Sequence, residues 1–169
     1  DPKRVGVWGG SAGGHLTALT AATCQNTTLD PASAQDGCVQ AAVTWYGVFD
    51  FAGMSTAPDG NSAGKRLLGC ETVCTAEQIA SVSPVTYINA QTPPFLLIHG
   101  NEDKTVPVEQ SHLGEAALRK AGVPVEAIYI PGVDHSFIGK TPQATRDASL
   151  KAVNATFDFF HAKLGVPTK

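Results

Sequence analysis

Residues 3–14 read Lys-Arg-Val-Gly-Val-Trp-Gly-Gly-Ser-Ala-Gly-Gly, and this stretch decides the fold. A short apolar run that ends in glycine is typical of a buried strand. The small residues that follow, together with Leu16, Ala18 and Leu19, predict a helix from Ser11 to Thr23. Ser11 is therefore expected in a glycine-rich turn between a strand and a helix.

Further apolar runs alternate with helical patterns along the chain. Strands are expected at residues 39–46, 95–99 and 125–130, and helices at 107–120 and 143–163, the last with Val153, Phe157, Phe160 and Leu164 on its apolar face. Apolar strands that alternate with helices predict an α/β fold with a parallel sheet of about four strands, covered on both faces.

Residues 50–92 interrupt this alternation as an irregular insert. Within it Thr75 is a candidate N-cap for a short helix over residues 76–81. The sequence contains no internal repeat and no low-complexity linker, so residues 1–169 are expected to form a single domain.

The composition excludes several classes of function. Of the 169 residues 43% are hydrophobic and 16% are charged, which suits a packed core, and the formal net charge is −3. No basic run indicates nucleic-acid binding, and no apolar run is long enough for a membrane span. No metal or cofactor is implied.

The turn around Ser11 matches a nucleophile elbow of the G-x-S-x-G type. Gly9, Gly10 and Gly13 surround the serine and allow the strand and helix backbones to approach one another. The competing interpretations are a plain glycine-rich turn and a dinucleotide-binding fingerprint, but the second lacks the G-x-G-x-x-G spacing. The backbone N–H of Ala12 would be one oxyanion-hole donor. The ten residues before Ser11 cannot form the upstream loop that usually supplies a second donor.

A carboxylate is expected a few residues after the strand at 95–99. Asp103 suits this position best, since its role would be to orient an imidazole and stabilise its cation. Glu102 is the immediate rival, although a solvated loop charge describes it better. Asp134 adjoins the candidate histidine in sequence and cannot readily reach the far ring nitrogen, so it is read as a loop charge.

A serine hydroxyl needs a neighbouring base, and His135 is the best candidate. It stands in a loop directly after the strand at 125–130, where a base must lie to meet Ser11. His99 precedes the acid and is interpreted as a packing residue at a strand end. His112 and His161 fall within expected helices and are interpreted as surface or packing residues.

The four cysteines suggest an oxidising compartment. Four cysteines allow three pairings, of which we favour Cys24–Cys38 and Cys70–Cys74 because both would close loops. Four free thiols are the alternative, and a zinc site is disfavoured because the two pairs lie in different connections. A secreted or periplasmic location is expected, with a cytoplasmic one left open.

Several segments together resemble one family. The elbow at 1–16, with segments 46–50, 83–88, 93–100, 103–107 and 135–137, is similar to bacterial α/β-hydrolase serine esterases of the hormone-sensitive-lipase and feruloyl-esterase-like type. The resemblance implies a hydrolase of carboxylic esters with Ser11, Asp103 and His135 as its triad. Members of this family place about four strands and an oxyanion loop before the elbow, so the chain resembles a truncated fold that lacks the N-terminal strands.

This comparison leads to expectations about partners and function. The strand at Val5–Val7 would be an open edge, which we expect a second copy or the missing N-terminal half to cover. The favoured function is a serine carboxylesterase acting on small-molecule short-chain or aryl esters, impaired as a fragment. The alternatives are a prolyl-oligopeptidase-like serine peptidase and an inactive assembly or binding module.

Overall fold

A computed structural model of the protein describes residues 1–24, 26, 38–54, 63–70 and 74–165. Its centre is a parallel sheet in the order β1-β2-β3-β4. The strands are β1 (Gly6–Gly10), β2 (Ala41–Trp45), β3 (Phe95–Gly100) and β4 (Val125–Ile130). The predicted four-stranded parallel sheet is confirmed, with each strand within a few residues of its expected position.

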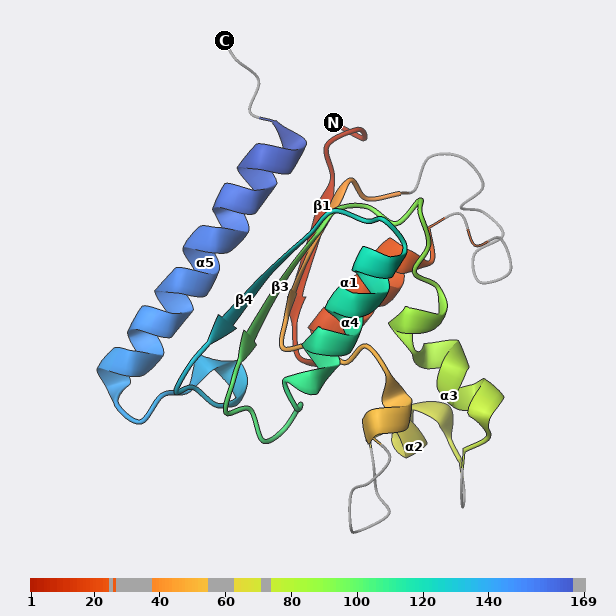
Figure 1. Cartoon of the computed structure of the whole chain (residues 1–169), viewed down its shortest axis with the longest axis horizontal. Helices are drawn as coiled ribbons and strands as arrows, with labels where there is room; N and C mark the ends of the chain where they lie inside the picture. The colour runs from red at the N-terminus through yellow and green to blue at the C-terminus, as the bar shows by residue number, and fades with distance from the viewer. Residues whose placement is uncertain (25, 27–37, 55–62, 71–73, 166–169) are drawn as a thin grey trace.

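Helices cover both faces of the sheet (Figure 1). Helices α1 (Ala12–Ala22) and α4 (Glu109–Lys120) pack on one face, and α5 (Pro142–Leu164) packs on the other. Every residue of β3 is buried, which is the pattern of a strand covered on both sides. The all-apolar sequence of its first four residues follows from that position.

The alternation of side chains along the strands divides the core into two clusters. Phe95 and Leu97 point toward α1 and α4, whereas Leu96 and Ile98 point toward α5. Leu97 is fully buried, so truncating it to alanine would cost about 2–5 kcal/mol. Both clusters hold the carboxyl ends of the strands in fixed positions.

Helix α5 presents a different face to the sheet from the one expected. Its buried residues are Ala148, Ala152, Thr156 and Phe159, whereas Phe157 is 51% exposed. The small side chains allow the helix to approach β2, where the Trp45 Nε1–H donates to the Thr156 hydroxyl at 3.0 Å. The prediction of an apolar face through Val153, Phe157, Phe160 and Leu164 was therefore wrong by about one position of rotation, although Phe160 and Leu164 still pack at its margin.

The described parts of the insert at 50–92 begin near the end of the sheet where the strands finish, and the segment after α3 leads back to the start of β3 (Figure 1). It contains the 3-10 helices η1 (Phe51–Met54) and η2 (Pro84–Thr86) and the short helices α2 (Ala63–Leu68) and α3 (Ala76–Val82). Thr75 caps α3 as expected: its hydroxyl accepts from the Gln78 N–H, and the Gln78 side chain accepts from the Thr75 N–H.

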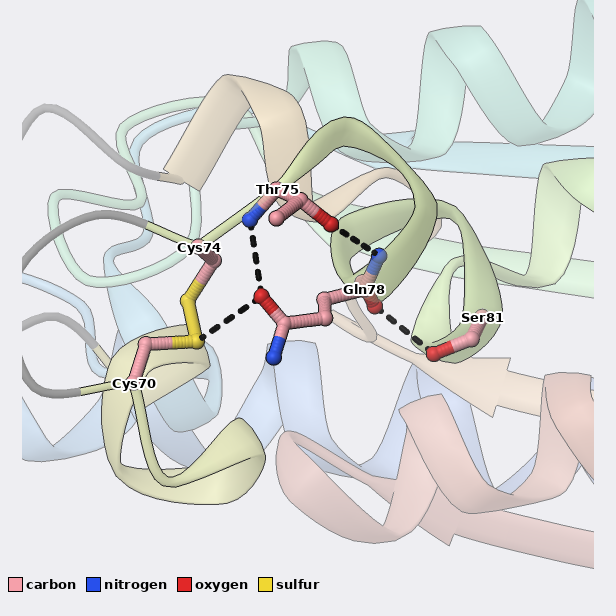
Figure 2. The surroundings of a disulfide bond; sticks show 5 residues. All are labelled: Cys70, Cys74, Thr75, Gln78 and Ser81. Atoms are coloured by element: carbon pink, nitrogen blue, oxygen red, sulfur yellow. Dashed lines mark hydrogen bonds between the residues drawn. A yellow bond between two sulfur atoms is a disulfide. The ribbon is translucent and has the colours of Figure 1, made fainter.

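Both favoured disulfides are present. Cys24–Cys38 joins the end of α1 to the approach to β2, with the Cα atoms 5.2 Å apart. Cys70–Cys74 joins the end of α2 to the start of α3, with the Cα atoms 5.3 Å apart. Figure 2 shows Cys70 Sγ beside Gln78 Oε1, the same oxygen that caps α3. None of the four cysteines is free.

The outer edge of β1 pairs with no strand among the described residues. Trp8 on this strand is 44% exposed and Val5, just before it, is 43% exposed. No helix in the described part of the chain is long and apolar enough to span a bilayer.

Candidate active site

Ser11 occupies the tight turn between β1 and α1. Its backbone has φ 55°, in the left-handed region that a residue with a side chain adopts only when its surroundings impose it. The Ser11 N–H donates to the Trp45 carbonyl at 2.9 Å, which ties the turn to the end of β2. The strain and the crossing of two backbones are those expected of a nucleophile elbow.

Glycines make this crossing possible, although one of the three predicted glycines is not required sterically. A Cβ at Gly9 would collide with the Gly13 backbone, and one at Gly10 would lie 3.0 Å from the Tyr46 hydroxyl. A Cβ at Gly13 would meet nothing within 4 Å, whereas one at Gly14 would lie 2.8 Å from the Trp45 carbonyl oxygen. The steric need on the helix side of the turn therefore falls on Gly14, which the motif alone did not single out.

His135 stands between the serine and the acid. It begins the 3-10 helix η3 (His135–Phe137), which directly follows the loop after β4. Its Nε2 lies 3.0 Å from Ser11 Oγ and its Nδ1 lies 2.8 Å from Asp103 Oδ2. With Nδ1–H donated to the carboxylate, Nε2 is left as an acceptor for the Ser11 hydroxyl. The three side chains come from loops after β1, β3 and β4, at the same end of the parallel sheet.

Asp103 is held firmly below the imidazole. Its side chain is fully buried, and Oδ1 accepts from the N–H groups of Thr105 and Val106 at 2.9 and 2.8 Å. Oδ2 contacts His135 and also lies 3.2 Å from Nε2 of His99. Glu102, the rival acid, is exposed. His112 on α4 and His161 on α5 are exposed.

Asp134 has a role beyond that of a loop charge. Its Oδ1 accepts from the Lys104 N–H at 2.9 Å and from the His135 N–H at 2.7 Å. These two backbone hydrogen bonds hold the pKa of the Asp134 carboxyl below its usual value. Asp134 thereby fastens the loop of the acid to the loop of the histidine, which sequence spacing did not reveal.

Tyr46 supports the imidazole from the side. Its backbone also has positive φ, 39°, and its ring lies edge-on to His135 with the ring centres 4.7 Å apart. The Phe137 ring packs against the same tyrosine at 4.8 Å. Burial raises the pKa of the Tyr46 phenol, so the ring stays neutral against the histidine.

Ala12 begins α1, so its N–H belongs to the first helical turn and has no acceptor within the helix. The N–H predicted from the sequence as an oxyanion donor thus lies directly after Ser11, and its role in binding an oxyanion stays a prediction. The residues before Ser11 form β1 and the exposed turn that leads into it, so this described segment contains no glycine-rich loop beside the site.

A cavity of about 430 Å³ opens beside Ser11. Most of its wall is apolar and comes from α1, η1, α2 and the segment after Asp103; the residues are Ser11, Ala12, His15, Leu16, Val48, Phe51, Met54, Arg66, Leu67, Thr105 and Val106. Phe51 lines this cavity, whereas Phe49 and Phe137 are buried in the core. No cluster of three or more metal-binding side chains is present in the described residues.

The chain is similar to mycobacterial esterases. Esterase LipQ of Mycobacterium tuberculosis is 33% identical over 141 residues, which cover 81% of this chain and 34% of LipQ. The probable carboxylic ester hydrolase LipM of the same organism is 36% identical over 142 residues, which cover 81% of this chain and 33% of LipM. The chain thus spans about a third of the length of these relatives.

Other matches include a peptidase and a solved esterase structure. The uncharacterized peptidase YuxL of Bacillus subtilis is 26% identical over 158 residues, which cover 94% of this chain and 22% of YuxL. A truncated form of a carbohydrate esterase from gut microbiota has the same fold, with a TM-score of 0.78 and 23% identity over 98% of this chain and 61% of that one.

The BD-FAE family model matches residues 1–118, which include Ser11 and Asp103. The match covers well over half of the 169 residues and agrees with the mycobacterial relatives and with the α/β-hydrolase fold. The chain therefore belongs to the BD-FAE family of esterase-like α/β-hydrolases.

Proposed function

We propose that the chain carries the catalytic machinery of a serine carboxylesterase that hydrolyses short-chain or aryl carboxylic esters. The observation that carries this proposal is the continuous hydrogen-bond chain from Ser11 through His135 to Asp103. The order nucleophile, acid, histidine along the sequence supports it, as does membership of an esterase-like family.

In the first half-reaction Ser11 Oγ attacks the carbonyl carbon of the ester. His135 Nε2 takes the hydroxyl proton as the new C–O bond forms, and Asp103 stabilises the resulting imidazolium. The carbonyl oxygen becomes an oxyanion, to which Ala12 donates its N–H. His135 then returns the proton to the leaving alkoxide, and the alcohol departs from an acyl-Ser11 intermediate.

In the second half-reaction water repeats these steps. His135 removes a proton from water, the hydroxide attacks the acyl carbon, and the collapse of the tetrahedral intermediate returns the proton to Ser11 Oγ. Loss of one oxyanion-hole donor typically slows such a reaction by roughly 100- to 1,000-fold.

The acyl group is assigned to the apolar cavity beside Ser11. Its wall of Leu16, Val48, Phe51 and Met54 favours burial of a hydrocarbon or aromatic acyl chain. The alcohol would leave toward solvent. This arrangement fits substrates such as p-nitrophenyl acetate and p-nitrophenyl butyrate.

Hydrolysis of these two esters tests the proposal. Ser11→Ala should abolish both hydrolysis and labelling by a fluorophosphonate, since it removes the attacking oxygen. Ser81→Ala is the matched control, because this serine is exposed on α3 and its hydroxyl donates only to the Gln78 carbonyl. Unchanged labelling in Ser11→Ala would refute the assignment of the nucleophile.

The same assay separates the alternatives. The similarity to YuxL makes a peptidase the second candidate, and cleavage of a peptide p-nitroanilide at a higher kcat/KM than the esters would support it. If none of the three substrates is hydrolysed and Ser11 is not labelled, an assembly or binding module is favoured.

The open edge of β1 and the disulfides support two further parts of the proposal. We infer that a second copy or a further segment of protein covers this edge, where Trp8 and Val5 are exposed. Self-association in sedimentation velocity that weakens in Trp8→Lys is the expected result, and a strictly monomeric chain at high concentration would contradict the second copy. The disulfides Cys24–Cys38 and Cys70–Cys74 support a secreted or periplasmic location.

A further inference from the structure

A second histidine lies directly behind the triad acid. His99 is near the end of β3, its side chain is fully buried, and both of its ring nitrogens have partners. Nδ1 lies 2.7 Å from the Ser111 hydroxyl on α4. Nε2 lies 2.9 Å from the Val106 carbonyl oxygen and 3.2 Å from Asp103 Oδ2.

These partners determine where the ring proton lies. Both atoms near Nε2 are acceptors, a carbonyl oxygen and a carboxylate oxygen, so Nε2 must carry the hydrogen. Nδ1 is then an acceptor, and the Ser111 hydroxyl donates to it. Burial lowers the pKa of His99, which keeps the ring neutral in this tautomer.

The charged groups around this ring are few. Asp103 faces it from the loop after β3, and His135 contributes from η3. The Tyr46 ring, at the end of β2, lies 6.5 Å away between ring centres, and α4 contributes the uncharged Ser111. The ionisation of His135 is therefore the event that His99 should sense.

We propose that His99 is a positioning residue of the triad: its Nε2–H, which bonds the Val106 carbonyl oxygen at 2.9 Å, is shared with Asp103 Oδ2 at 3.2 Å and holds that oxygen against Nδ1 of His135. Oδ2 then lies between two imidazole N–H donors, while Oδ1 accepts from the backbone of Thr105 and Val106. Three N–H groups donate to the carboxylate, and the shared Nε2–H of His99 is the fourth group that faces it. The inference rests on the proposed function only for its kinetic consequence.

The hydrogen bond from His99 to Asp103 should lower the basicity of His135. The hydrogen of His99 Nε2 takes up part of the negative charge of Asp103 that would otherwise act on His135. Without this donor the carboxylate would favour the imidazolium more strongly, while its oxygen would be less well placed. The loss should therefore move the acidic limb of the pH profile to higher pH and lower kcat. It should leave KM unchanged, since His99 does not line the cavity.

The unmodified protein provides the first test, through the ring ¹⁵N resonances of its five histidines. His99 should show a protonated Nε2 and an unprotonated Nδ1 between about pH 5 and pH 8, the range in which an unperturbed imidazole changes charge. Its Nε2 resonance should shift with the same midpoint as the ring of His135. An unprotonated Nε2, or a resonance that ignores the titration of His135, would overturn the proposal.

Variants provide the second test. His99→Phe should lower kcat about tenfold and raise the acidic limb by roughly half a pH unit, because one hydrogen bond to a charged group is lost. His99→Gln should recover most of kcat, since its amide retains one donor and one acceptor. His112→Phe is the matched control, because His112 is exposed and its ring contacts Tyr129 rather than the triad.

A purely structural role predicts a different pattern. It would leave the acidic limb of the pH profile and the kcat of the folded enzyme unchanged in His99→Phe, and only the melting temperature would fall. If His99→Phe does not fold, the double variant with Ser111→Ala removes the unpaired hydroxyl and is measured instead. Should both fail to fold, the ¹⁵N titration of the unmodified chain decides the question.

The failure of this inference is distinguishable from failure of the proposed function. An enzyme that hydrolyses esters through Ser11 but shows an unchanged profile in His99→Phe would refute the positioning role alone. A chain that neither hydrolyses esters nor labels with fluorophosphonate would refute the esterase. The ¹⁵N titration would then still show whether His99 donates to Asp103.

Discussion

Alanine substitutions at two neighbouring glycines of α1 should differ in their effect on the free energy of unfolding. At Gly14 a Cβ would lie 2.8 Å from the Trp45 carbonyl oxygen, 3.0 Å from the Gly47 Cα and 3.2 Å from the Gly47 nitrogen. All three are backbone atoms at the end of β2, so no flexible side chain can yield. At Gly13 the same methyl group would meet nothing within 4 Å.

The magnitudes follow from this contrast. Both substitutions gain up to about 1 kcal/mol, because alanine is the better helix former. Only Gly14→Ala also carries the cost of forcing atoms into a filled space, which is about 1–3 kcal/mol. Gly13→Ala should therefore be more stable than the unmodified chain, and Gly14→Ala less stable than Gly13→Ala by roughly 1–3 kcal/mol. For a domain of this size each kcal/mol moves the melting temperature by about 2–4 °C.

Urea denaturation of the two variants measures this gap, and fluorophosphonate labelling measures its effect on the nucleophile. Displacement of the Trp45 carbonyl in Gly14→Ala removes the acceptor of the Ser11 N–H, so labelling should slow in this variant alone. Equal unfolding midpoints and equal labelling rates for the two variants would refute the close crossing of α1 and β2.

Two other sets of contacts lead to testable predictions, one in the core and one between α4 and β4. Thr44 has a buried hydroxyl without a hydrogen-bond partner, so Thr44→Val should raise the free energy of unfolding by about 1 kcal/mol. Thr156→Val should lower it by about 1–3 kcal/mol, because Trp45 Nε1–H loses its acceptor. Urea unfolding that shows the same sign for both variants would contradict this. The hydrogen bond from the Tyr129 hydroxyl lowers the pKa of Glu115, so its stabilisation is present above the unfolded value of 4.5 and lost as pH falls through the lower folded value. Tyr129→Phe should weaken that acid dependence, and an unchanged slope of stability between pH 5 and pH 3 (a range of about two units around the reference value) would contradict it.

The sequence was informative where chemistry depends on chain order. Ser11 could be predicted from a glycine-rich turn between a strand and a helix, and His135 from its place just after the last strand. The carboxyl ends of parallel strands meet at one edge of a sheet, so the order of elements was enough to bring both residues and Asp103 together.

Contacts that depend on packing between distant segments could not be predicted. His99 meets Ser111 only because α4 lies across the end of β3, and Asp134 meets the Lys104 N–H only because two loops lie side by side. The face of α5 was also beyond the pattern, because apolar residues occupy two adjacent stripes and only the small ones, such as Ala148, allow close approach. The hydrophobic period predicted this helix but not which of its faces packs on the sheet.

The cavity wall and the triad belong to different parts of the chain. Phe51, Met54, Arg66 and Leu67 come from the insert, whereas Ser11, Asp103 and His135 stand on turns that the sheet itself supports. If the proposed function holds, replacement of residues in η1 or α2 would alter which acyl groups the cavity accommodates and would leave the hydrogen-bond chain from Ser11 to Asp103 in place. Such a division lets substrate preference diverge among related enzymes without renewed selection on the chemical step.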